Sequence, residues 1–417
     1  MLVFKFGGAS VKDSNGVRNL LNIVSTYSDN LVVVVSAFGK TTNALEEILK
    51  LSYQDMAMSL SKVDDLKKYH FNMIDDLFTD KHHEIFAEID GEFNLLVNKL
   101  TDEKYNSYDL KYDQIVSFGE IFSTKIISAF LNAEQLSNRW IDIRKVLKTD
   151  DIYREAKIDF EITQKESEKT FDFKDHRVFI TQGFIGGSKK GLVTTLGREG
   201  SDYTAAVLAN LLNANKVVVW KDVEGILNAD PQFFDDTKKL DKLSYQEAVE
   251  LAYFGAKVIH PKTLKPLHNK NIPLYVRSFI NPDDKGTEID CFKEYDQNLP
   301  VFVLKKDQIL ISLFPKDLSF VLEDELSRIF KYLSDHRIKV NIIQNSAISI
   351  SFCIDNANSK SKQLIEKLKE DYKVLYNDQL ELLTIRHYTE EAINKITWNR
   401  KIFIEQRSRH TAHFVIK

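Results

Sequence analysis

The sequence has only two cysteines, Cys291 and Cys353, in 417 residues. So few thiols exclude a disulfide framework and a cysteine-based zinc site, and they suit a reducing cytoplasm. Long apolar runs are missing too, since the longest one, LVVVVSAF at 31–38, is far shorter than the roughly 20 residues that span a bilayer. The N-terminal MLVFKFGGAS has Lys5 inside its apolar stretch and no small-residue cleavage site, unlike a signal peptide. We therefore expect a cytoplasmic protein that has no membrane partner.

An excess of charge of either sign is also missing. The 57 Lys and Arg residues and 61 Asp and Glu residues give a net charge of −4, and no basic tract stands out. Proteins that bind nucleic acid usually carry a basic patch, so we expect no nucleic-acid partner. The hydrophobic share of 43% and charged share of 28% are typical of a globular protein. A chain of this length is expected to divide into two or three domains.

Short β-branched runs alternate with longer helical stretches over roughly the first two thirds of the chain. The runs that predict strands are LVFKF (2–6), LVVVV (31–35), RVFIT (177–181), KVVVW (216–220) and IPLYV (272–276). Several are almost continuously apolar, as in parallel strands that are covered on both faces. A long helical region lies between Lys40 and Trp140, and the polar stretch 157–175 reads as a surface excursion. The pattern predicts an α/β domain with a wound, mostly parallel sheet sandwiched by helices.

The remainder of the chain changes character after about residue 294. Strand and helix patterns follow one another in the order βαββαβ, which is typical of ferredoxin-like regulatory modules. A second, shorter copy starts at LELLTIRHY (380–388) and ends with the strand TAHFVIK (411–417). We therefore expect three domains, at 1–295, 296–378 and 379–417.

KFGGAS (5–10) follows the first predicted strand directly. The adjacent Gly7 and Gly8 allow backbone N–H groups to approach an anion, and Ser10 is a possible start of the next helix. Lys5 projects from the carboxyl end of the strand, where open α/β sheets bind ligands, and its charge suits a phosphoryl group. The alternative is an ordinary Gly-Gly turn with an exposed lysine. Neither a Walker A loop nor a Gly-x-Gly-x-x-Gly pattern is present.

TTLGREGSDYTAA (194–206) combines glycines, a cation and carboxylates before a helix-forming segment. Arg198 offers a planar fork for a carboxylate or phosphate. Ser201 is predicted to cap a helix that runs through Leu212, with Asp202 in its first turn. Asp202 is ambiguous at this point, because the helix dipole favours an acidic residue there whether or not it has a function.

Three further stretches carry weaker signals. SFGE (117–120) places Glu120 beside a glycine on a helical pattern, where a carboxylate can hold a substrate ammonium. VVVWKDVEGILNADP (217–231) is a strand followed by an acidic loop that either covers a nucleotide or is only a loop. GAKVIHPKT (255–263) carries Lys257, a second lysine for phosphate or a plain surface lysine. Ser244 and Glu247 form a predicted capping box ahead of AVELAYF.

Taken together, these stretches resemble aspartate kinase of the amino-acid-kinase family. The resemblance covers most of residues 1–290, with its motifs in one order: KFGGAS, VSAFGKTTNAL, SFGE, WIDIRKVLKTDD, TQGFIG, TTLGREGSDYTAA, KDVEGILNADP, LSYQEAVELAYFGAKVIHPKT and IPLYVRSFINPDDKGT. The later modules resemble ACT domains. The resemblance implies an amino-acid-kinase-type fold followed by ACT-like modules. Because the edge strands of such βαββαβ units readily pair side by side, we expect a homodimer formed through those modules.

The resemblance also implies a reaction and a role for each matching residue. ATP would phosphorylate the side-chain carboxylate of L-aspartate, in the first step toward lysine, threonine and methionine. Lys5 would stabilise the transferring phosphoryl group, and Asp202 would organise the positive groups around it. Arg198 would pair with an aspartate carboxylate and Glu120 with its ammonium. The substrate pocket would be completed by Ser36, Thr42 and Ser201.

The nucleotide side of the site follows from the same resemblance. The residues that would contact ATP are Gly7, Gly8, Lys221, Asp222, Lys257 and Val258. Mg²⁺ would bridge the β- and γ-phosphates, as phosphoryl transfer generally requires. No side chain of the protein is assigned as a metal ligand.

This sequence departs from the family pattern at four places. Glu199 stands where a glycine is usual, and we expect its side chain to point away from the anionic substrates. Lys221, Leu227 and Gln232 replace a threonine, a tyrosine and an arginine of the nucleotide loop, and Ala9 replaces a threonine. In the regulatory part, VLEDEL (321–326) and Asn341 replace the Gly-Phe-Leu turn and the aspartate of relatives that lysine inhibits.

These departures leave two other functions open. A degenerate kinase that serves as a regulatory or binding subunit would fit the altered nucleotide loop, and a kinase for another amino acid would fit the same scaffold. From VLEDEL and the short second module we also expect weak or absent inhibition by lysine or threonine.

Overall fold

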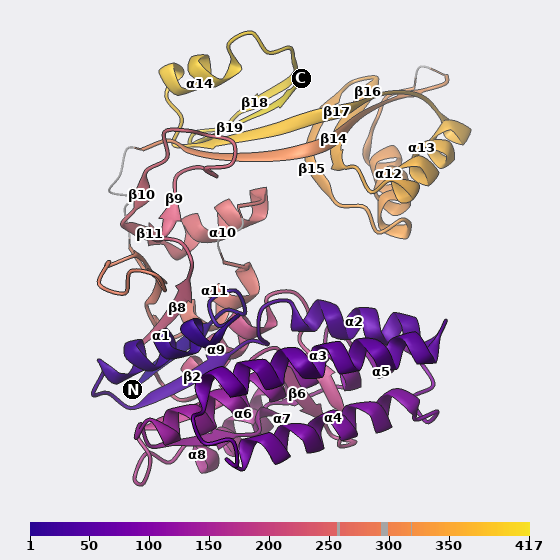
Figure 1. Ribbon diagram of the computed structural model, residues 1–417. Coiled ribbons are helices and arrows are strands. Elements are labelled where there is room, and N and C mark those ends of the chain that lie inside the picture. The colour runs from indigo at the N-terminus through magenta and orange to yellow at the C-terminus, as the bar shows by residue number, and fades with distance from the viewer. Residues whose placement is uncertain (257–258, 293–298, 318) are drawn as a thin grey trace. The chain divides into compact units, whose positions relative to one another are not determined.

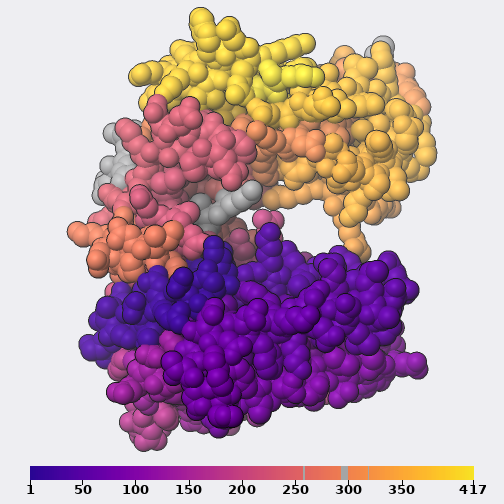
Figure 2. All heavy atoms as spheres, in the orientation of Figure 1, coloured from indigo at the N-terminus to yellow at the C-terminus, as the bar shows by residue number. Residues whose placement is uncertain are grey.

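The computed structural model describes residues 1–256, 259–292, 299–317 and 319–417. The chain forms two compact units (Figure 1). Unit 1 comprises Met1–Ile226, Lys239–Val249 and Ile259–Tyr295, and unit 2 comprises Leu227–Lys238, Glu250–Val258 and Asp296–Lys417. In the space-filling view, the face of unit 1 toward the reader is formed mainly by the N-terminal part of the chain, coloured indigo to purple (Figure 2).

An eight-stranded sheet forms the centre of unit 1, with the strand order β11-β13-β12-β8-β1-β2-β5-β3. Its strands are β1 (Leu2–Phe6), β2 (Leu31–Val35), β3 (Asn138–Ile141), β5 (Val178–Gln182), β8 (Lys216–Lys221), β11 (Lys242–Ser244), β12 (Leu274–Ser278) and β13 (Thr287–Asp290). All neighbouring strands are parallel except β12 and β13. The five predicted strands and the mostly parallel sheet are therefore confirmed.

The two faces of β1 contact different parts of unit 1, because successive side chains of a strand point to opposite sides. Phe4 and Phe6 belong to the large apolar core that is completed by the helices between Ser14 and Ala133. Lys5 is therefore on the other face, which is covered by helix α9 (Gly200–Leu211) packing against β1, β2 and β8. This alternation places Lys5 under α9.

Helices form both outer layers of unit 1 (Figure 1). They are α1 (Ser14–Ser25), α2 (Thr41–Ser52), α3 (Met56–Leu77), α4 (Ile85–Thr101), α5 (Tyr108–Val116), α6 (Phe118–Ala133), α7 (Ile143–Val146), α8 (Phe160–Thr170), α9, α10 (Tyr245–Phe254, which continues into unit 2) and α11 (Pro261–His268). Among the described residues, Tyr108–Ala133 is long and apolar enough to cross a membrane, but 89% of its apolar window is buried inside the structure. It is a core helix pair. The short strands are β4 (Lys148–Thr149), β6 (Ile185–Ser188), β7 (Val193–Thr195), β9 (Ile226–Leu227) and β10 (Lys239–Leu240).

The helix starts that were predicted from local sequence patterns are partly wrong. Helix α1 begins at Ser14 after Asp13, whose side chain accepts from the backbone N of Gly16, so Ser10 does not start it. Helix α9 begins at Gly200, and its N-cap is Glu199 in a left-handed backbone conformation. Ser201 is therefore inside the first turn and is not the cap. The predicted Ser244 contact is confirmed, since its hydroxyl accepts from the backbone N of Glu247 at 3.0 Å.

The predicted surface excursion at 157–175 is also partly wrong, because α8 lies within it. Thr163 and Ser167 are fully buried on this helix, and the Thr163 hydroxyl accepts from the backbone N of Lys148 at 3.0 Å. Because small hydroxyl residues occupy its packed face, the sequence of α8 shows no apolar pattern from which the helix could be predicted.

Unit 2 is built on a six-stranded antiparallel sheet with the order β15-β16-β14-β17-β19-β18. The strands are β14 (Val301–Pro315), β15 (Val340–Ser346), β16 (Ser349–Asp355), β17 (Tyr372–Arg386), β18 (Ile402–Arg407) and β19 (Thr411–Ile416), and the helices are α12 (Glu323–Asp335), α13 (Ser359–Asp371) and α14 (Glu390–Thr397). One core joins β14 and β16 to α12 and α13, and another joins β17 and β19 to α14. The predicted ferredoxin-like order of elements is confirmed.

Candidate active site

A buried ion pair lies at the carboxyl end of β1, between the sheet and α9. The Lys5 ammonium lies 2.7 Å from the Asp202 carboxylate, with only 10% and 4% of the two side chains exposed. The alternative of an exposed lysine is therefore wrong. Burial alone would raise the pKa of Asp202, but the charges of Lys5 and Lys221 outweigh it and lower that pKa. Asp202 is an ionised carboxylate held by lysines.

Lys221 is the second lysine at this carboxylate. It ends β8, the strand next to β1, and its Nζ lies 3.9 Å from Oδ2 of Asp202. Two ammonium groups thus face one buried carboxylate, the Lys5 side chain 10% exposed and the Lys221 side chain 27% exposed. Such a centre favours an anion that is brought to the end of the sheet.

The turn after β1 folds closely over this centre. A Cβ atom on Gly7 would lie 3.6 Å from the Lys5 ammonium, and one on Gly8 would lie 2.4 Å from the carbonyl oxygen of Ala37. No side chain fits at Gly8 without moving the backbone. Ser10 donates its hydroxyl to the Asp222 carboxylate at 2.8 Å, so the predicted nucleotide loop after β8 is joined to the turn after β1.

Glu120 is the second buried carboxylate of the site and lies on α6. Its Oε1 accepts from the backbone N of Ala37 at 3.2 Å, while its Oε2 is buried and has no hydrogen-bond partner among the described residues. Burial raises the pKa of Glu120 to about 8, although the Ala37 amide and the Lys5 charge act in the opposite direction. An unpartnered carboxylate oxygen in a closed position is suited to a ligand ammonium.

Gly119 explains how α6 comes so close to the loop after β2. A Cβ atom on Gly119 would lie 2.8 Å from the Cβ of Ala37, which is nearer than real side chains approach. Glycine at this position lets the helix pack on the loop and brings the neighbouring Glu120 to the Ala37 amide.

The predicted substrate loop turns sharply before α9. Gly197 has φ 76° and Glu199 has φ 53°, so the chain passes twice through the left-handed region within three residues. Ser201 is buried, and Gly183 makes room for it, because a Cβ on Gly183 would lie 2.5 Å from the Ser201 Cβ. Arg198 is exposed and makes no hydrogen bond or ion pair within the described part of the chain.

The loop after β2 carries the other predicted substrate residues. Ser36 is half-buried, and its backbone N donates to the carbonyl of Phe6 at 3.2 Å. Thr42 is half-buried in the first turn of α2. Its neighbour Thr41 is only 2% exposed, and its buried hydroxyl has no partner among the described residues. The local sequence gives no signal that separates these two threonines.

Asp113 on α5 is a buried carboxylate that sequence reasoning missed. It accepts from the backbone N and the hydroxyl of Thr195, at 2.9 and 2.7 Å, and from the backbone N of Arg154 at 3.0 Å. Burial raises its pKa to about 6 in spite of these bonds. Since Thr195 ends β7 just before Leu196 and Gly197, Asp113 anchors the start of the predicted substrate loop. The motif KYDQIV around it matches no pattern that could have signalled this role.

Lys257 and Val258 lie outside the described residues. The described ranges contain no group of three or more His, Cys, Asp or Glu residues that could hold a metal ion.

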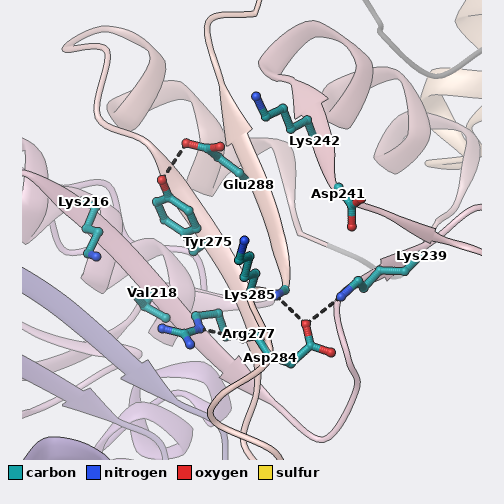
Figure 3. Close-up of a pocket in the computed structure, with 11 residues that line it drawn as sticks. Lys216, Val218, Lys239, Asp241, Lys242, Tyr275, Arg277, Asp284, Lys285 and Glu288 are labelled. Atoms are coloured by element: carbon teal, nitrogen blue, oxygen red, sulfur yellow. Dashed lines mark hydrogen bonds and ion pairs between the residues drawn. The ribbon is translucent and has the colours of Figure 1, made fainter. Parts of the chain in front are cut away.

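A separate cavity of about 600 Å³ lies over β8, β12 and β13 of unit 1 (Figure 3). Its lining has five lysine or arginine side chains and three carboxylates, so it suits an anion better than a cation. Several of these charges are already paired: Lys239 donates to Asp284 at 2.6 Å, and Tyr275 donates to Glu288 at 2.5 Å. None of the residues predicted to bind substrate or nucleotide lines this cavity.

Comparison with known proteins agrees with this geometry. Residues 1–278 match the amino acid kinase family. The lysine-sensitive aspartokinase 3 of Escherichia coli (strain K12) is 32% identical over 369 residues, which are 87% of this chain and 80% of that protein. The chloroplastic aspartokinase 2 of Arabidopsis thaliana is 30% identical over 384 residues, covering 88% of this chain and 69% of that protein.

A solved structure is similar over the whole chain. The crystal structure of E. coli aspartokinase III in complex with aspartate and ADP has a TM-score of 0.83 and 28% sequence identity, and the match covers 100% of this chain and 96% of that one. The sequence comparisons and the structural comparison therefore agree, and the structural match extends over both units.

Proposed function

The chain belongs to the amino acid kinase family and, within it, to the aspartokinases, and from this membership we propose that it transfers the γ-phosphoryl group of ATP to the side-chain carboxylate of L-aspartate. The product is 4-phospho-L-aspartate, in the first step of the aspartate pathway. The observation that carries the proposal is the buried centre of Lys5, Asp202 and Lys221 at the end of the sheet.

The transfer brings two anions together. One oxygen of the aspartate side chain attacks the γ-phosphorus, and the bond from that phosphorus to the β,γ-bridging oxygen breaks, which releases ADP. Lys5 offsets the negative charge that gathers on the phosphoryl oxygens, and it is worth most at a buried site that excludes water. Asp202 holds the Lys5 and Lys221 ammonium groups in place before the reactants arrive.

The acceptor is held by groups on both sides of this centre. The unpartnered Oε2 of Glu120 receives the ammonium of aspartate, and Arg198 supplies a fork for one of its carboxylates. Ser36, Thr42 and Ser201 complete the pocket. Since Arg198 is exposed, its side chain is expected to become ordered only when aspartate is present.

The nucleotide occupies the turn after β1 and the loop after β8. Gly7 and Gly8 give the phosphates access to backbone N–H groups, and Lys221 and Asp222 contact the nucleotide together with Lys257 and Val258. Mg²⁺ supplies charge neutralisation at the β- and γ-phosphates.

The regulatory part and the assembly belong to the same proposal. Residues 1–295 form the catalytic domain, and 296–378 and 379–417 form two ACT-like modules. A cytoplasmic homodimer fits this arrangement, because β15 and β18 end the sheet of unit 2 and edge strands readily pair with a second copy. Light scattering should then give twice the 48.2 kDa of one chain.

Activity is tested with purified protein, ATP, Mg²⁺ and aspartate. ADP release should be matched by an acyl phosphate that hydroxylamine traps, and Lys5→Ala should lower kcat by roughly 100- to 1000-fold. Lys12→Ala, which removes an exposed lysine of the same turn, is the control. No acyl phosphate at millimolar aspartate, or Lys5→Ala no slower than the parent, would contradict the proposal. If a substrate panel showed turnover with a different amino acid instead of aspartate, the protein would be another kinase of this family.

A further inference from the structure

Glu199 has a backbone conformation that glutamate rarely adopts. Its φ of 53° and ψ of 30° are left-handed, a region in which the Cβ of any residue except glycine is crowded. It lies between Arg198 and Gly200, directly before the helix that carries Asp202. Its side chain makes no capping bond to that helix, so helix capping does not explain why a glutamate is here.

The Glu199 carboxylate instead reaches a different segment of unit 1. Its Oε2 accepts from the backbone N of His260 at 2.9 Å. His260 is the N-cap of α11, where its ring nitrogen accepts from the backbone N of Lys262 at 3.1 Å. Glu199 therefore binds the residue that caps α11, and its charge is directed to a donor and not left among the substrate anions.

A second connection joins the same two segments. Lys262 donates its ammonium to the carbonyl oxygen of Leu196 at 2.9 Å, and the same ammonium lies 4.5 Å from the centre of the Tyr203 ring. In both bonds the donor lies at the start of α11 and the acceptor lies in the loop, on the Glu199 side chain in one and on the Leu196 backbone in the other. Residues 196–203 and 260–262 are held together at two points.

We propose that Glu199 is a positioning residue that couples the binding of aspartate to the binding of the nucleotide. This rests on the proposed function, in which Arg198, next to Glu199 in the chain, binds a carboxylate of aspartate. His260 follows, after one residue, the pair 257–258 that is assigned to the nucleotide. A ligand that orders either segment also orders the other through the Glu199 bond, so each ligand raises the affinity for the other by the same factor.

The coupling is measured by calorimetry on the full chain, with Mg-ADP titrated in the absence and presence of saturating aspartate. In the parent protein, aspartate should raise the affinity for Mg-ADP by at least about fivefold, the usual lower range of such coupling. Glu199→Ala removes the acceptor and should reduce this factor to about one. Glu199→Gln keeps an oxygen acceptor and should retain at least about half of it.

Glu199→Gly distinguishes the effect of losing the carboxylate from the effect of backbone strain, because glycine adopts the left-handed conformation without strain. It should lose the coupling as Glu199→Ala does, while melting at the same temperature as the parent or higher. Gln135→Gly is the matched control: Gln135 is exposed, has φ 64° and follows α6, so its replacement should leave the coupling unchanged.

The outcomes distinguish this inference from the proposed function. If the parent binds both ligands without coupling, or if Glu199→Ala and Glu199→Gly keep the parent's coupling, Glu199 does not position the site and only this inference is overturned. If the parent binds neither aspartate nor Mg-ADP, the proposed function is overturned and the inference with it.

Discussion

The Glu120 carboxylate and the backbone amide of Ala37 are joined by a 3.2 Å hydrogen bond that uses one carboxylate oxygen and leaves the other without a partner in the described part of the chain. The burial that creates this arrangement also raises the pKa of Glu120 to about 8. Near neutral pH the free enzyme therefore carries a proton on the group that is proposed to hold the substrate ammonium.

Aspartate binding should consequently depend on pH. An ammonium binds a carboxylate much better than a neutral carboxyl group, so kcat/KM for aspartate should rise with pH and level off above about pH 8. Glu120→Gln should raise the KM for aspartate by roughly 10- to 100-fold and abolish this rise. The check is a pH series of initial rates for both proteins. A pH-independent KM in the parent would contradict the assignment of Glu120.

Glu120 should also make the stability of the fold depend on pH. Stability should fall as the pH rises, whereas aspartate binding should improve. The pKa of Glu120 is higher in the folded chain than the ordinary value of 4.5, so the folded state binds more protons between these two values. Its contribution to stability is present below about pH 4.5 and is lost as the pH rises toward 8. Denaturant unfolding of Glu120→Gln should lack this part of the decline.

Asp113 should be a structural anchor whose loss is costly. Asp113→Ala leaves the amides of Thr195 and Arg154 and the Thr195 hydroxyl without their acceptor, and buried unpaired donors cost about 1–3 kcal/mol each. We expect a loss of at least about 2 kcal/mol in the free energy of unfolding. The exposed Asp109→Ala on the same helix should change it by less than about 0.5 kcal/mol. Equal stabilities of the two variants would show that Asp113 anchors nothing.

Two helical glycines should respond in opposite ways to alanine. Gly119→Ala places a Cβ 2.8 Å from that of Ala37, so α6 must shift, which is expected to cost about 1–3 kcal/mol and to raise the KM for aspartate by displacing Glu120. A Cβ on Gly91, in α4, would meet nothing within 4 Å, so Gly91→Ala should stabilise by about 0.5–1 kcal/mol. Thermal unfolding and aspartate kinetics of the pair provide the measurement.

Lysine and threonine should inhibit this enzyme weakly or not at all. Asn341 in β15 is already engaged by its own chain: its Oδ1 accepts from Lys305 at 2.9 Å, and its Nδ2 donates to Gln308 at 2.8 Å and to Asp355 at 2.9 Å. An effector would have to displace these bonds. We expect inhibition constants above about 1 mM, measured by ADP release with each amino acid added. A low-micromolar constant for either would refute this expectation.

The fold of unit 1 could be predicted because its signals are local. Strands such as LVVVV at 31–35 are buried on both faces along their whole length, so the apolar run itself predicts a strand. The same logic failed for α8, whose buried Thr163 and Ser167 look polar in sequence. Burial of hydroxyl groups depends on partners that are distant in the chain, and no window of sequence contains them.

Residues of the candidate site could be predicted from the sequence only where they belong to a motif of the resemblance. The resemblance assigned Lys5 to the phosphoryl group and Asp202 to the positive groups around it, and the structure holds the two side chains in an ion pair. Asp113 was missed because its partners, Arg154 and Thr195, come from other segments and belong to no motif. Ser201 was placed at the helix cap because serine favours that position, whereas the left-handed turn at Glu199 starts the helix earlier.

The two 15-residue strands of unit 2 have a further consequence for regulation. Strands β14 and β17 remain paired from Val301 and Arg386 at one end to Pro315 and Tyr372 at the other, with register shifts only near Lys305, Gln308 and Leu310. The core with α12 and α13 and the core with α14 share these strands, so neither half can melt or rotate alone without breaking backbone hydrogen bonds of the other. Any signal received by one half is therefore a signal to the whole sheet.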